Sequence, residues 1–506
     1  MELTNLLHGF ALALSPTNIL ACFLGAFLGT VTGVLPGIGP AAAMSLLLPI
    51  TFGLEPTTGL IMLAGIYYGA MYGGSTTSIL LNMPGETASM VTCFDGYQMA
   101  KKGRAGAALA VSAIGSWLAG TVSIIGLMLF APALANIALA FGPAEYFALI
   151  LLGVLTLNNL TGDSFLKATL MLVIGLGIAT IGTEIIKGIS RFDFGNSDLL
   201  EGLDVIPVLM GLFGLSEVFV SLHDRDTVPE VAKVKFRDLY PTMEEIKRSI
   251  APIFRGTAIG FPIGLLPGPA HILSTMVSYR VEKGVSRHPE QFGKGAIEGV
   301  AGPEAANNAA STGAMIPLFA LGLPFTVQAA IMIAALRTHN ITPSPLLISQ
   351  HGDIFWAVIA SMYIGNVMLL LLNLPLVGVF ASLIKTPPKI LLPVITTIML
   401  IGTYGLNGNL FDVWVLLFFG VLGYILRIVD YPSVPLIIAL VLGPSFEERL
   451  RQSLLLAHGD LSFYLQRPVT AAILALTAIV VIWGLSQSTV KRIMSNRTPT
   501  GSGVAS

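Results

Sequence analysis

Apolar stretches that approach or reach the length needed to cross a lipid bilayer recur along this chain. A transmembrane helix needs about 17–25 predominantly apolar residues, and the clearest stretches are 107–129, 144–157, 166–186, 353–379 and 469–483. Only 11% of the 506 residues are charged, whereas a soluble domain carries about 25%, so too few are available to cover a water-facing surface. We therefore predict an all-α polytopic membrane protein with about 10–12 membrane segments.

Other classes of protein find little support in the sequence. The net charge is −1, which gives no indication of a nucleic-acid partner. The two cysteines, Cys22 and Cys93, lie in or beside apolar segments and predict neither a disulfide framework nor a metal cluster. A P-loop, an HExxH motif and a nucleophile elbow are absent, so we predict that the chain is not an enzyme. The N-terminal stretch lacks a basic region and a clean cleavage site, and we expect it to start the first membrane segment.

Pro-Gly pairs interrupt two of the apolar regions. The first is GVLPGIGP at 33–40, and the second is GLLPGPA at 264–270. Each pair is followed by a stretch rich in Ser, Thr or Asn, then by a second proline turn and a polar exit. These stretches are YGGSTTSILLNMPGETAS at 72–89 and PEAANNAASTGAMIPLFALGLPFTVQAA at 303–330. The same order occurs in both blocks, which indicates two duplicated halves rather than a solenoid.

The polarity of the chain divides it into four regions. We predict a first transmembrane repeat at 1–222, a polar connector loop at 223–249 and a second transmembrane repeat at 250–445. Residues 446–506 are predicted to form an interfacial amphipathic segment, a final transmembrane helix and a tail. Basic residues place this tail and the loop near residue 100 on the cytoplasmic side by the positive-inside rule; they are Lys101, Lys102, Arg104, Lys491, Arg492 and Arg497.

The two breaks predict a binding site. Non-helical backbone at membrane depth is tolerated only where it is buried in protein or lines a watery cavity. A broken helix exposes N–H groups that attract anions at one end and carbonyl groups that bind Na⁺ at the other. Paired breaks in corresponding halves are typical of the substrate site of a secondary transporter. The alternative is that these residues serve only as kinks and close-packing positions.

Polar side chains near the breaks suit the same site. Hydroxyl and amide groups can hold a carboxylate or complete a shell of oxygens around Na⁺, although each can equally bond a neighbouring helix. Intramembrane ionisable residues are functional candidates. Glu86 and Glu304 lie either at the site or at the water boundary, and His271 binds a carboxylate or a proton, or packs.

These motifs resemble the large (TctA-type) membrane subunit of the tripartite tricarboxylate transporters of bacteria. The matching pieces include GVLPGIGP, YGGSTTSILLNMPGETAS, DGYQMAKKGRAG, FGKGAIEGVAGPEAANNAA and RQSLLLAHGD, and they run from about residue 20 to residue 470. The resemblance implies a transporter in the bacterial inner membrane, with two inverted repeats in an elevator-like architecture. It also implies two protein partners, a periplasmic solute-binding protein and a small membrane subunit, and an ion gradient of Na⁺ or H⁺ in place of ATP or a cofactor.

By motif, the resemblance implies that two sets of residues line the substrate site. The first half contributes Pro36, Gly37, Gly39, Ser75, Thr76, Asn82, Pro84, Gly85 and Thr87. The second half contributes Pro267, Gly268, Asn307, Asn308, Ser311, Thr312, Pro324, Phe325 and Thr326. A Na⁺ site is expected near Gly37, Asn82, Gly268 and Asn308.

Two departures from the family pattern fall in the second half. The second proline turn reads LPFTVQ where the family usually has Pro-Gly and a small residue, and GLLPGPAH has Pro269 where glycine spacing is common. Phe325 narrows or dries the pocket, which favours a carboxylate smaller or less charged than citrate. We predict import of an organic di- or tricarboxylate by cation symport. A stand-alone permease for another small anion, a channel and an intramembrane enzyme are the alternatives, and the sequence leaves the oligomeric state open.

Overall fold

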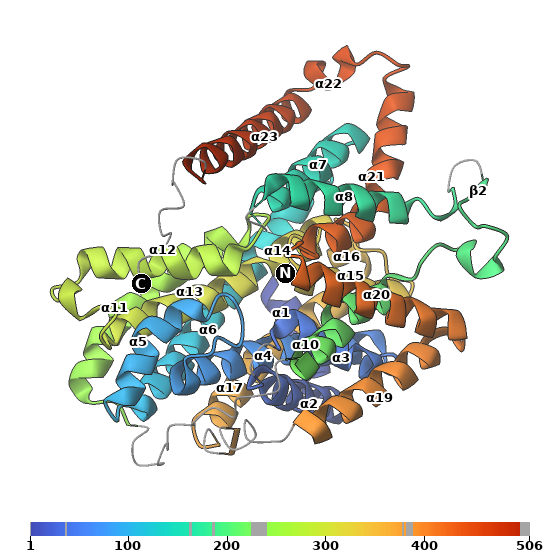
Figure 1. Ribbon diagram of the computed structural model, residues 1–506. Coiled ribbons are helices and arrows are strands. Elements are labelled where there is room, and N and C mark those ends of the chain that lie inside the picture. Colours follow the sequence, from blue (N-terminus) through green and yellow to red (C-terminus); the bar gives the residue numbers. More distant parts are fainter. Residues whose placement is uncertain are drawn as a thin grey trace, which may run out of the picture. The chain divides into compact units, whose positions relative to one another are not determined.

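The computed structural model describes residues 2–35, 38–160, 164–184, 188–223, 240–376, 379–380 and 388–495, and most of them are helical (Figure 1). In these ranges the regular strands are β1 (Gly182–Thr183) and β2 (Ser190–Arg191), which form one antiparallel pair. The prediction of an all-α protein is therefore confirmed.

Helices long and apolar enough to cross a membrane are present in the described chain. Five qualify by length and composition: Pro16–Gly33, Ala105–Ala138, Val205–Leu222, Gly352–Asn373 and Leu410–Ile428. Shorter apolar helices accompany them, among them Pro143–Thr156, Val327–Thr338 and Pro468–Gly484. The multi-pass membrane fold is confirmed, whereas the predicted segment count, the inverted repeats and the elevator-like arrangement stay predictions.

The chain folds into two compact units. The first comprises 1–140 and 203–425, and the second comprises 141–202 and 426–506. This grouping follows contacts in space, and the four regions predicted along the sequence stay predictions. The predicted connector at 223–249 lies largely outside the described residues. Its last residues, from Met243 onward, form the first turns of a helix.

The first unit contains most of the helices. Their bounds in chain order are α1 (Glu2–Ala13), α2 (Pro16–Gly33), α3 (Pro40–Leu47), η1 (Leu48–Thr51), α4 (Pro56–Leu81), α5 (Met90–Lys101), α6 (Ala105–Ala138), α9 (Val205–Leu209), the π-helical η3 (Met210–Leu215), α10 (Ser216–His223), α11 (Met243–Gly264), α12 (Ala270–Val285), η5 (Pro289–Gln291), α13 (Glu298–Gly313), α14 (Met315–Leu321), α15 (Val327–Thr338), α16 (Leu347–Gln350), α17 (Gly352–Asn373), α19 (Pro388–Asn407) and α20 (Leu410–Ile428). Helix α13 packs against α11, α12, α6 and α5 (Figure 1). Every residue from Gly299 to Gly313 is buried.

Glycines at every fourth position let α2 lie directly on the backbone of α4. A Cβ atom added to Gly29 would lie 2.3 Å from the carbonyl oxygen of Ile66. Gly25 and Gly33, one turn before and one turn after, are equally close to the backbone of α4. Small residues at this spacing let two membrane helices approach until their backbones touch, which stabilises the pair by close packing.

The same packing recurs between α11 and α13. A Cβ atom added to Gly260 would lie 2.1 Å from the carbonyl oxygen of Ala306, and Gly256 and Gly264 make the matching contacts one turn to either side. The two predicted halves therefore each contain one helix pair built on three glycines. In both pairs the first helix is the one that ends at a predicted Pro-Gly break.

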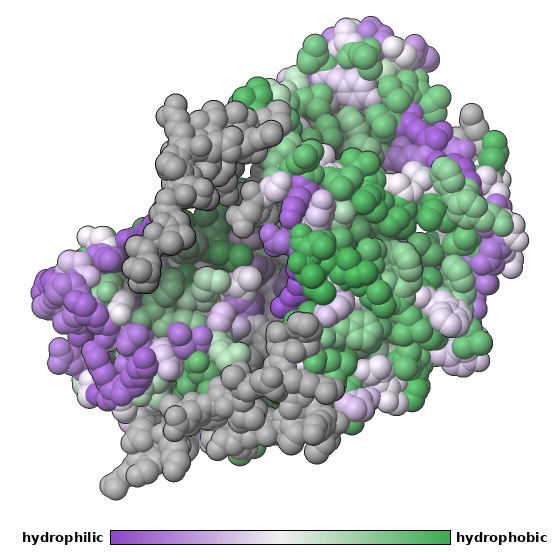
Figure 2. Space-filling view, viewed as in Figure 1, coloured by the Kyte–Doolittle hydropathy of each residue, from purple (hydrophilic) through white to green (hydrophobic). Residues whose placement is uncertain are grey.

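The outer faces of the first unit carry apolar side chains. Exposed residues include Phe130 of α6, Leu371 of α17 and Trp414 and Phe418 of α20. Apolar residues cover much of the visible surface, while hydrophilic residues gather over one end of α11 and α12 (Figure 2). A surface of this kind suits a lipid environment with water at the helix ends.

Paired charges mark this hydrophilic end. The guanidinium of Arg104 bonds the carboxylate of Glu245, and Arg248 donates two hydrogen bonds, of 2.8 and 2.9 Å, to the carboxylate of Glu298. Lys102, in the predicted cytoplasmic loop near residue 100, donates to the carbonyl oxygen of Lys294. Polar segments from both predicted halves therefore meet at one end of the unit.

The second unit consists of α7 (Pro143–Leu160), α8 (Phe165–Ala179), β1, β2, η2 (Ser197–Leu199), α21 (Val434–Leu456), α22 (Ser462–Gln466) and α23 (Pro468–Ser495). Helix α21 packs on α7 and α8, and α23 packs on α7. The guanidinium of Arg467 donates to the carboxylate of Glu145 over 2.6 and 3.0 Å, which joins α23 to α7. The apolar segment predicted at 166–186 is too long, because α8 ends at Ala179 and the chain turns into β1.

Candidate functional site

Helix ends flank both predicted breaks. Helix α2 ends at Gly33 and α3 begins at Pro40, while α11 ends at Gly264 and α12 begins at Ala270. Pro36 and Gly37 lie outside the described residues. In the second break, Pro267 precedes Gly268, whose φ of 129° is open to glycine but strained for other residues. The interruptions that the Pro-Gly pairs predict are therefore present.

Each half has a second interruption at its second proline. Helix α4 ends at Leu81 and is capped by Asn82, a non-glycine residue in the left-handed region with φ of 57°. Helix α14 ends at Leu321 and is capped by Gly322 at φ of 69°. After the second of these turns, the Thr326 hydroxyl accepts the Ala329 N–H over 3.2 Å and caps the N-terminus of α15.

The break and the second turn of each half lie against each other. In the first half, a Cβ atom on Gly85 would lie 3.0 Å from the carbonyl oxygen of Gly33, and one on Gly39 would lie 3.6 Å from the carbonyl oxygen of Gly85. In the second half, the Gly268 N–H points to the carbonyl oxygen of Phe325 over 3.5 Å. The N-termini of α3 and α12 therefore each lie beside the second turn of their own half.

Side chains join the two halves across this region. The Tyr67 hydroxyl of α4 lies 2.8 Å from Nε2 of His271, in the first turn of α12. The Asn307 amide of α13 donates to the Glu86 carboxylate over 2.6 Å. Helix α15 also packs against α3 and α4. The structure thus brings the four interruptions of the first unit into one polar region.

Asn307 carries an unpaired polar atom in this region. The residue is 1% exposed, and while its Nδ2 donates to Glu86, its Oδ1 has no hydrogen-bond partner within the described chain. An unsatisfied buried acceptor is costly and calls for a partner. A cation or the hydroxyl group of a substrate would supply that partner.

The hydroxyl groups of the predicted site bond mostly to protein. Ser75 donates to the Glu304 carboxylate over 2.7 Å, and Thr76 donates to the Tyr72 carbonyl oxygen one turn earlier. Ser311 and Thr312 likewise bond the carbonyl oxygens four residues before them in α13. Their lone pairs remain available, but their protons are committed within the protein.

The other predicted residues differ in exposure. Asn308 is 4% exposed, and its amide donates to the Ser116 hydroxyl over 2.7 Å and to the Glu304 carbonyl oxygen over 3.1 Å. Asn82 and Thr87 are exposed at the first turn. Phe325 is 7% exposed at the second turn, where its carbonyl oxygen faces the Gly268 N–H, and Pro267 is half-buried. The roles assigned to all these residues stay predictions, as does the Na⁺ site.

The sequence did not predict the hydroxyl groups that surround the Glu304 carboxylate. Glu304 is 1% exposed, so the interpretation that places it at the water boundary is wrong. Its carboxylate accepts hydrogen bonds from Ser75 of α4, Thr92 of α5 and Ser112 of α6. The i, i+4 pair Ser112 and Ser116 faces the i, i+4 pair Glu304 and Asn308, and this matched spacing is the signal that the sequence contained.

Asp95 is a second buried carboxylate. In the sequence it begins DGYQMAKKGRAG, the polar stretch that follows the first half's second proline turn. It is fully buried, and its Oδ1 accepts the backbone N–H groups of Gly293, Gly295 and Ala296 over 2.7 to 2.9 Å. Its Oδ2 accepts the Tyr279 hydroxyl over 2.9 Å. A carboxylate that accepts several N–H groups fixes a loop strongly, so Asp95 of the first half positions the segment before α13 in the second half.

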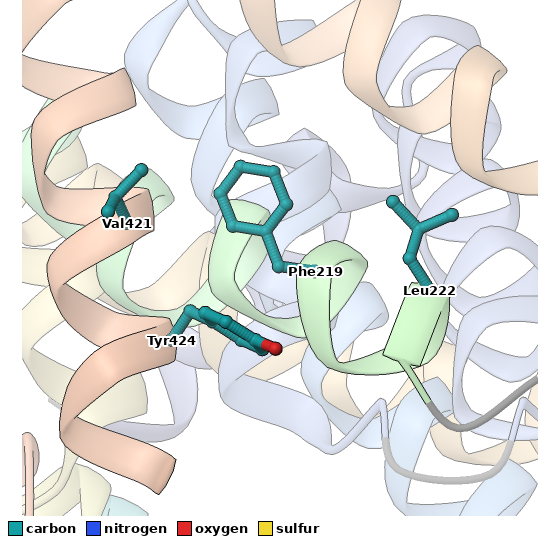
Figure 3. Close-up of a pocket in the computed structure, with 4 residues that line it drawn as sticks. All are labelled: Phe219, Leu222, Val421 and Tyr424. Carbon is teal, nitrogen blue, oxygen red and sulfur yellow. The ribbon is translucent and has the colours of Figure 1, made fainter. Parts of the chain in front are cut away.

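A separate open pocket of about 390 Å³, lined mainly by apolar groups, lies between α10 and α20 (Figure 3). Phe219 and Leu222 line it from α10, and Val421 and Tyr424 line it from α20. No predicted site residue takes part in it. In the described chain, no group of three or more His, Cys, Asp or Glu residues is placed to hold a metal ion.

Comparison with known proteins identifies relatives. The family model described as "Tripartite tricarboxylate transporter TctA family" matches residues 19–438. An "Uncharacterized 52.8 kDa protein in TAR-I ttuC' 3'region" of Agrobacterium vitis is 47% identical over 486 residues, which cover 96% of this chain and 97% of that protein. A second protein of that organism, from the TAR-II ttuC' 3'region, is 43% identical over 229 residues, which cover 45% of this chain and 95% of that protein. No solved structure matches this chain.

Proposed function

The chain belongs to the tripartite tricarboxylate transporter TctA family, and from this premise we propose that it is the large transmembrane subunit of a binding-protein-dependent secondary transporter. It imports an organic carboxylate across a bacterial inner membrane by symport with Na⁺ or H⁺. A small membrane subunit and a periplasmic solute-binding protein are its partners. No cofactor is needed, because the ion gradient supplies the driving force.

One observation carries the proposal: the two Pro-Gly breaks and the two second turns lie in a single polar region, where Tyr67 contacts His271 and Asn307 bonds Glu86. The N-termini of α3 and α12 each lie beside the turn of their own half, through Gly39 with Gly85 and Gly268 with Phe325. Helix N-termini carry a partial positive charge and free N–H groups, and both favour an anion. Irregular backbone at this depth has a physical reason when it binds a solute.

Coupling follows from the cost of moving charge. A bare carboxylate is expensive to carry through a low-dielectric barrier. A cation that binds with the anion offsets that charge, so the loaded site crosses more easily than the site that holds the anion alone. The unpaired Oδ1 of Asn307, beside the Glu86 carboxylate, supports a site where a cation or a substrate hydroxyl binds.

The substrate is proposed to be a carboxylate smaller or less charged than citrate. The family resemblance implies a glycine at this turn, where the present chain has Phe325, and Phe325 is buried at the turn that meets Gly268. An apolar ring at that position removes space and a backbone approach that a bulky polar anion would use. Succinate and malate therefore suit the site better than citrate.

Uptake into proteoliposomes tests the proposal. The reconstituted complex contains the chain, the small membrane subunit and the solute-binding protein, and the probes are radiolabelled succinate, malate and citrate. We expect accumulation that requires a Na⁺ or a pH gradient and the binding protein. Gradient-independent flux would indicate a channel, turnover without transport would indicate an enzyme, and full uptake without the binding protein would indicate a stand-alone permease; each of these outcomes contradicts the proposal.

A further inference from the structure

Glu304 lies at the centre of a buried cluster of hydroxyl groups in the first unit. Three hydroxyl groups from three different helices, α4, α5 and α6, donate to its two carboxylate oxygens. Ser75 and Ser112 both reach Oε2, over 2.7 and 3.0 Å, and Thr92 reaches Oε1. All four residues are buried.

Within the described part of the chain, no positively charged group pairs with this carboxylate. The ionisable groups close enough to interact with it electrostatically are Tyr72 of α4, Cys93 of α5 and Glu86 of the first turn. Helix α6 carries no ionisable residue between Ala105 and Ala138. An ionised carboxylate buried without a cation is costly, so this site calls for a positive ion.

The charged groups of the remaining neighbours are occupied elsewhere. On α11, Arg255 forms an ion pair with Glu282 of α12 over 2.5 Å, and Arg248 pairs with Glu298 at the start of α13. On α12, His271 bonds Tyr67. No lysine, arginine or histidine of the described chain that packs near α13 forms an ion pair with Glu304.

The geometry favours a proton over Na⁺. Sodium needs lone pairs that point at a common centre, but here the hydroxyl protons point at the carboxylate in direct contacts of ordinary hydrogen-bond length. Such contacts leave no room for an ion between the oxygens. A proton needs no such room, because it forms an O–H bond on one carboxylate oxygen.

Ser75 lets the cluster hold both protonation states. Its oxygen lies 2.7 Å from Oε2 of Glu304 and also 3.2 Å from the carbonyl oxygen of Met71. With Glu304 ionised, the Ser75 hydroxyl donates to Oε2. With Glu304 protonated, the new O–H group of Oε2 donates to Ser75, whose own proton turns to Met71. Every donor has an acceptor in both states.

We propose that Glu304 is a proton-binding site of the transporter, loaded from water on one side of the membrane and emptied to water on the other in each transport cycle. This rests on the function proposed above and selects H⁺ as the coupling ion. On loading, a water-derived proton forms the O–H bond at Oε2 and neutralises the carboxylate. On release, the same bond breaks and the proton returns to water, so that one proton moves with the anion.

The first test compares wild type with Glu304→Gln, which imitates the protonated state and cannot release a proton. In proteoliposomes of the complex, a pH difference of about 1 unit supports about tenfold accumulation for each coupled proton. We expect wild type to accumulate succinate or malate under this gradient and Glu304→Gln to lose that accumulation, while its exchange of internal for external substrate persists. Glu304→Asp should restore part of the accumulation. Equal pH-driven accumulation in wild type and Glu304→Gln would overturn the proposal.

The second test uses the hydroxyl partners and controls for folding. Ser112→Ala removes one donor to the ionised carboxylate, so the proton is held more tightly and the pH dependence of uptake moves to higher pH. Ser123 is the matched control, because it is a buried serine on the same helix whose hydroxyl has no partner in the described chain. We expect Ser123→Ala to leave the pH dependence unchanged. An identical profile for both variants and wild type would contradict the proposal.

The third test needs no substrate and separates this proposal from the transport function. Infrared spectra of the complex in nanodiscs, recorded across a pH series, should contain a protonated-carboxyl band that titrates, that is absent in Glu304→Gln and that persists in Ser123→Ala. A Glu304 that never changes protonation state would overturn the proposal even if the complex transports succinate. If wild type takes up none of the three acids while the band titrates, the transport function fails and the proton site stands.

Discussion

The turn after α4 and the turn after α14 hold the same place in their halves but differ in exposure and chemistry. The first, 82–89, contains Pro84 and Gly85, and its Met83 is 38% exposed. The second, 322–326, contains Pro324, and its Phe325 is 7% exposed. Both follow a left-handed helix cap and precede a new helix.

This difference teaches that the two halves share a scaffold but not a site. The scaffold is the glycine-based helix pair, which recurs as α2 on α4 and α11 on α13. The two turns are unequal, since the first contains the exposed Met83 and the second contains the buried aromatic ring of Phe325. In the proposed transporter, Phe325 limits the size of the solute at the second turn.

The largest effect should come from the shared scaffold. Gly29→Leu in α2 and Gly260→Leu in α11 each force a side chain against a backbone carbonyl group about 2 Å away, and overpacking a close contact costs about 1–3 kcal/mol or more. We expect neither variant to accumulate in the membrane, as measured by yield and by thermal unfolding in detergent. Gly284→Leu is the control, because no atom lies within 4 Å of a Cβ there. Loss of yield in only one of the two variants would show that the two helix pairs are not equivalent.

Uptake should separate the site from the scaffold. Pro84→Ala loosens the first turn, and Asn308→Ala removes the amide that bonds Ser116. If these stretches form the transport site, both variants reach the membrane at normal yield and lose uptake of succinate and malate. Normal uptake in both would show that the two stretches only pack.

The helix caps should differ in tolerance. Gly322→Ala meets the left-handed penalty of about 1–2 kcal/mol and also places Cβ 2.3 Å from the Pro343 carbonyl oxygen. Asn82→Ala meets a similar penalty but adds no new atom at Cβ, because Asn82 is exposed and already carries a Cβ atom. We expect the thermal unfolding midpoint to fall further for Gly322→Ala. Equal shifts would mean that the two caps are equally constrained.

Substrate preference should show the smallest change. Phe325→Leu keeps the second turn apolar but removes the ring, which should raise citrate uptake relative to succinate uptake by roughly tenfold, the scale of discrimination expected from a small change in an apolar pocket. Competition between the two labelled acids measures the ratio. An unchanged ratio of citrate to succinate uptake would place Phe325 away from the substrate. The difference between the two turns would then concern packing alone.

The sequence predicts the interruptions well because proline and glycine act locally. The helix ends around 33–40 and 264–270 follow from a missing N–H donor and from backbone freedom, both of which can be inferred from a few residues. The same holds for the turns at Pro84 and Pro324. The membrane class follows equally directly from the shortage of charged residues.

The hydrogen-bond partners of the two buried carboxylates could not be predicted from spacing alone, because these partners lie on other helices. Glu304 is hydrogen-bonded to Ser75, Thr92 and Ser112, which come from three other helices. Asp95 looks like the polar end of a segment in the sequence, yet it is buried because α5 packs against α13. Hydropathy describes one segment at a time, so it places such residues at a water boundary when their partners lie on other helices.

The glycine contacts have a mechanical consequence. Two backbones that touch along three helical turns cannot slide or tilt relative to each other without steric clashes. The pair α2 with α4 and the pair α11 with α13 should therefore each move as a rigid body. We expect any change of shape during a working cycle to fall on the non-helical turns at 82–89 and 265–269. The residues that bind the cargo and the residues that bend would then be the same ones.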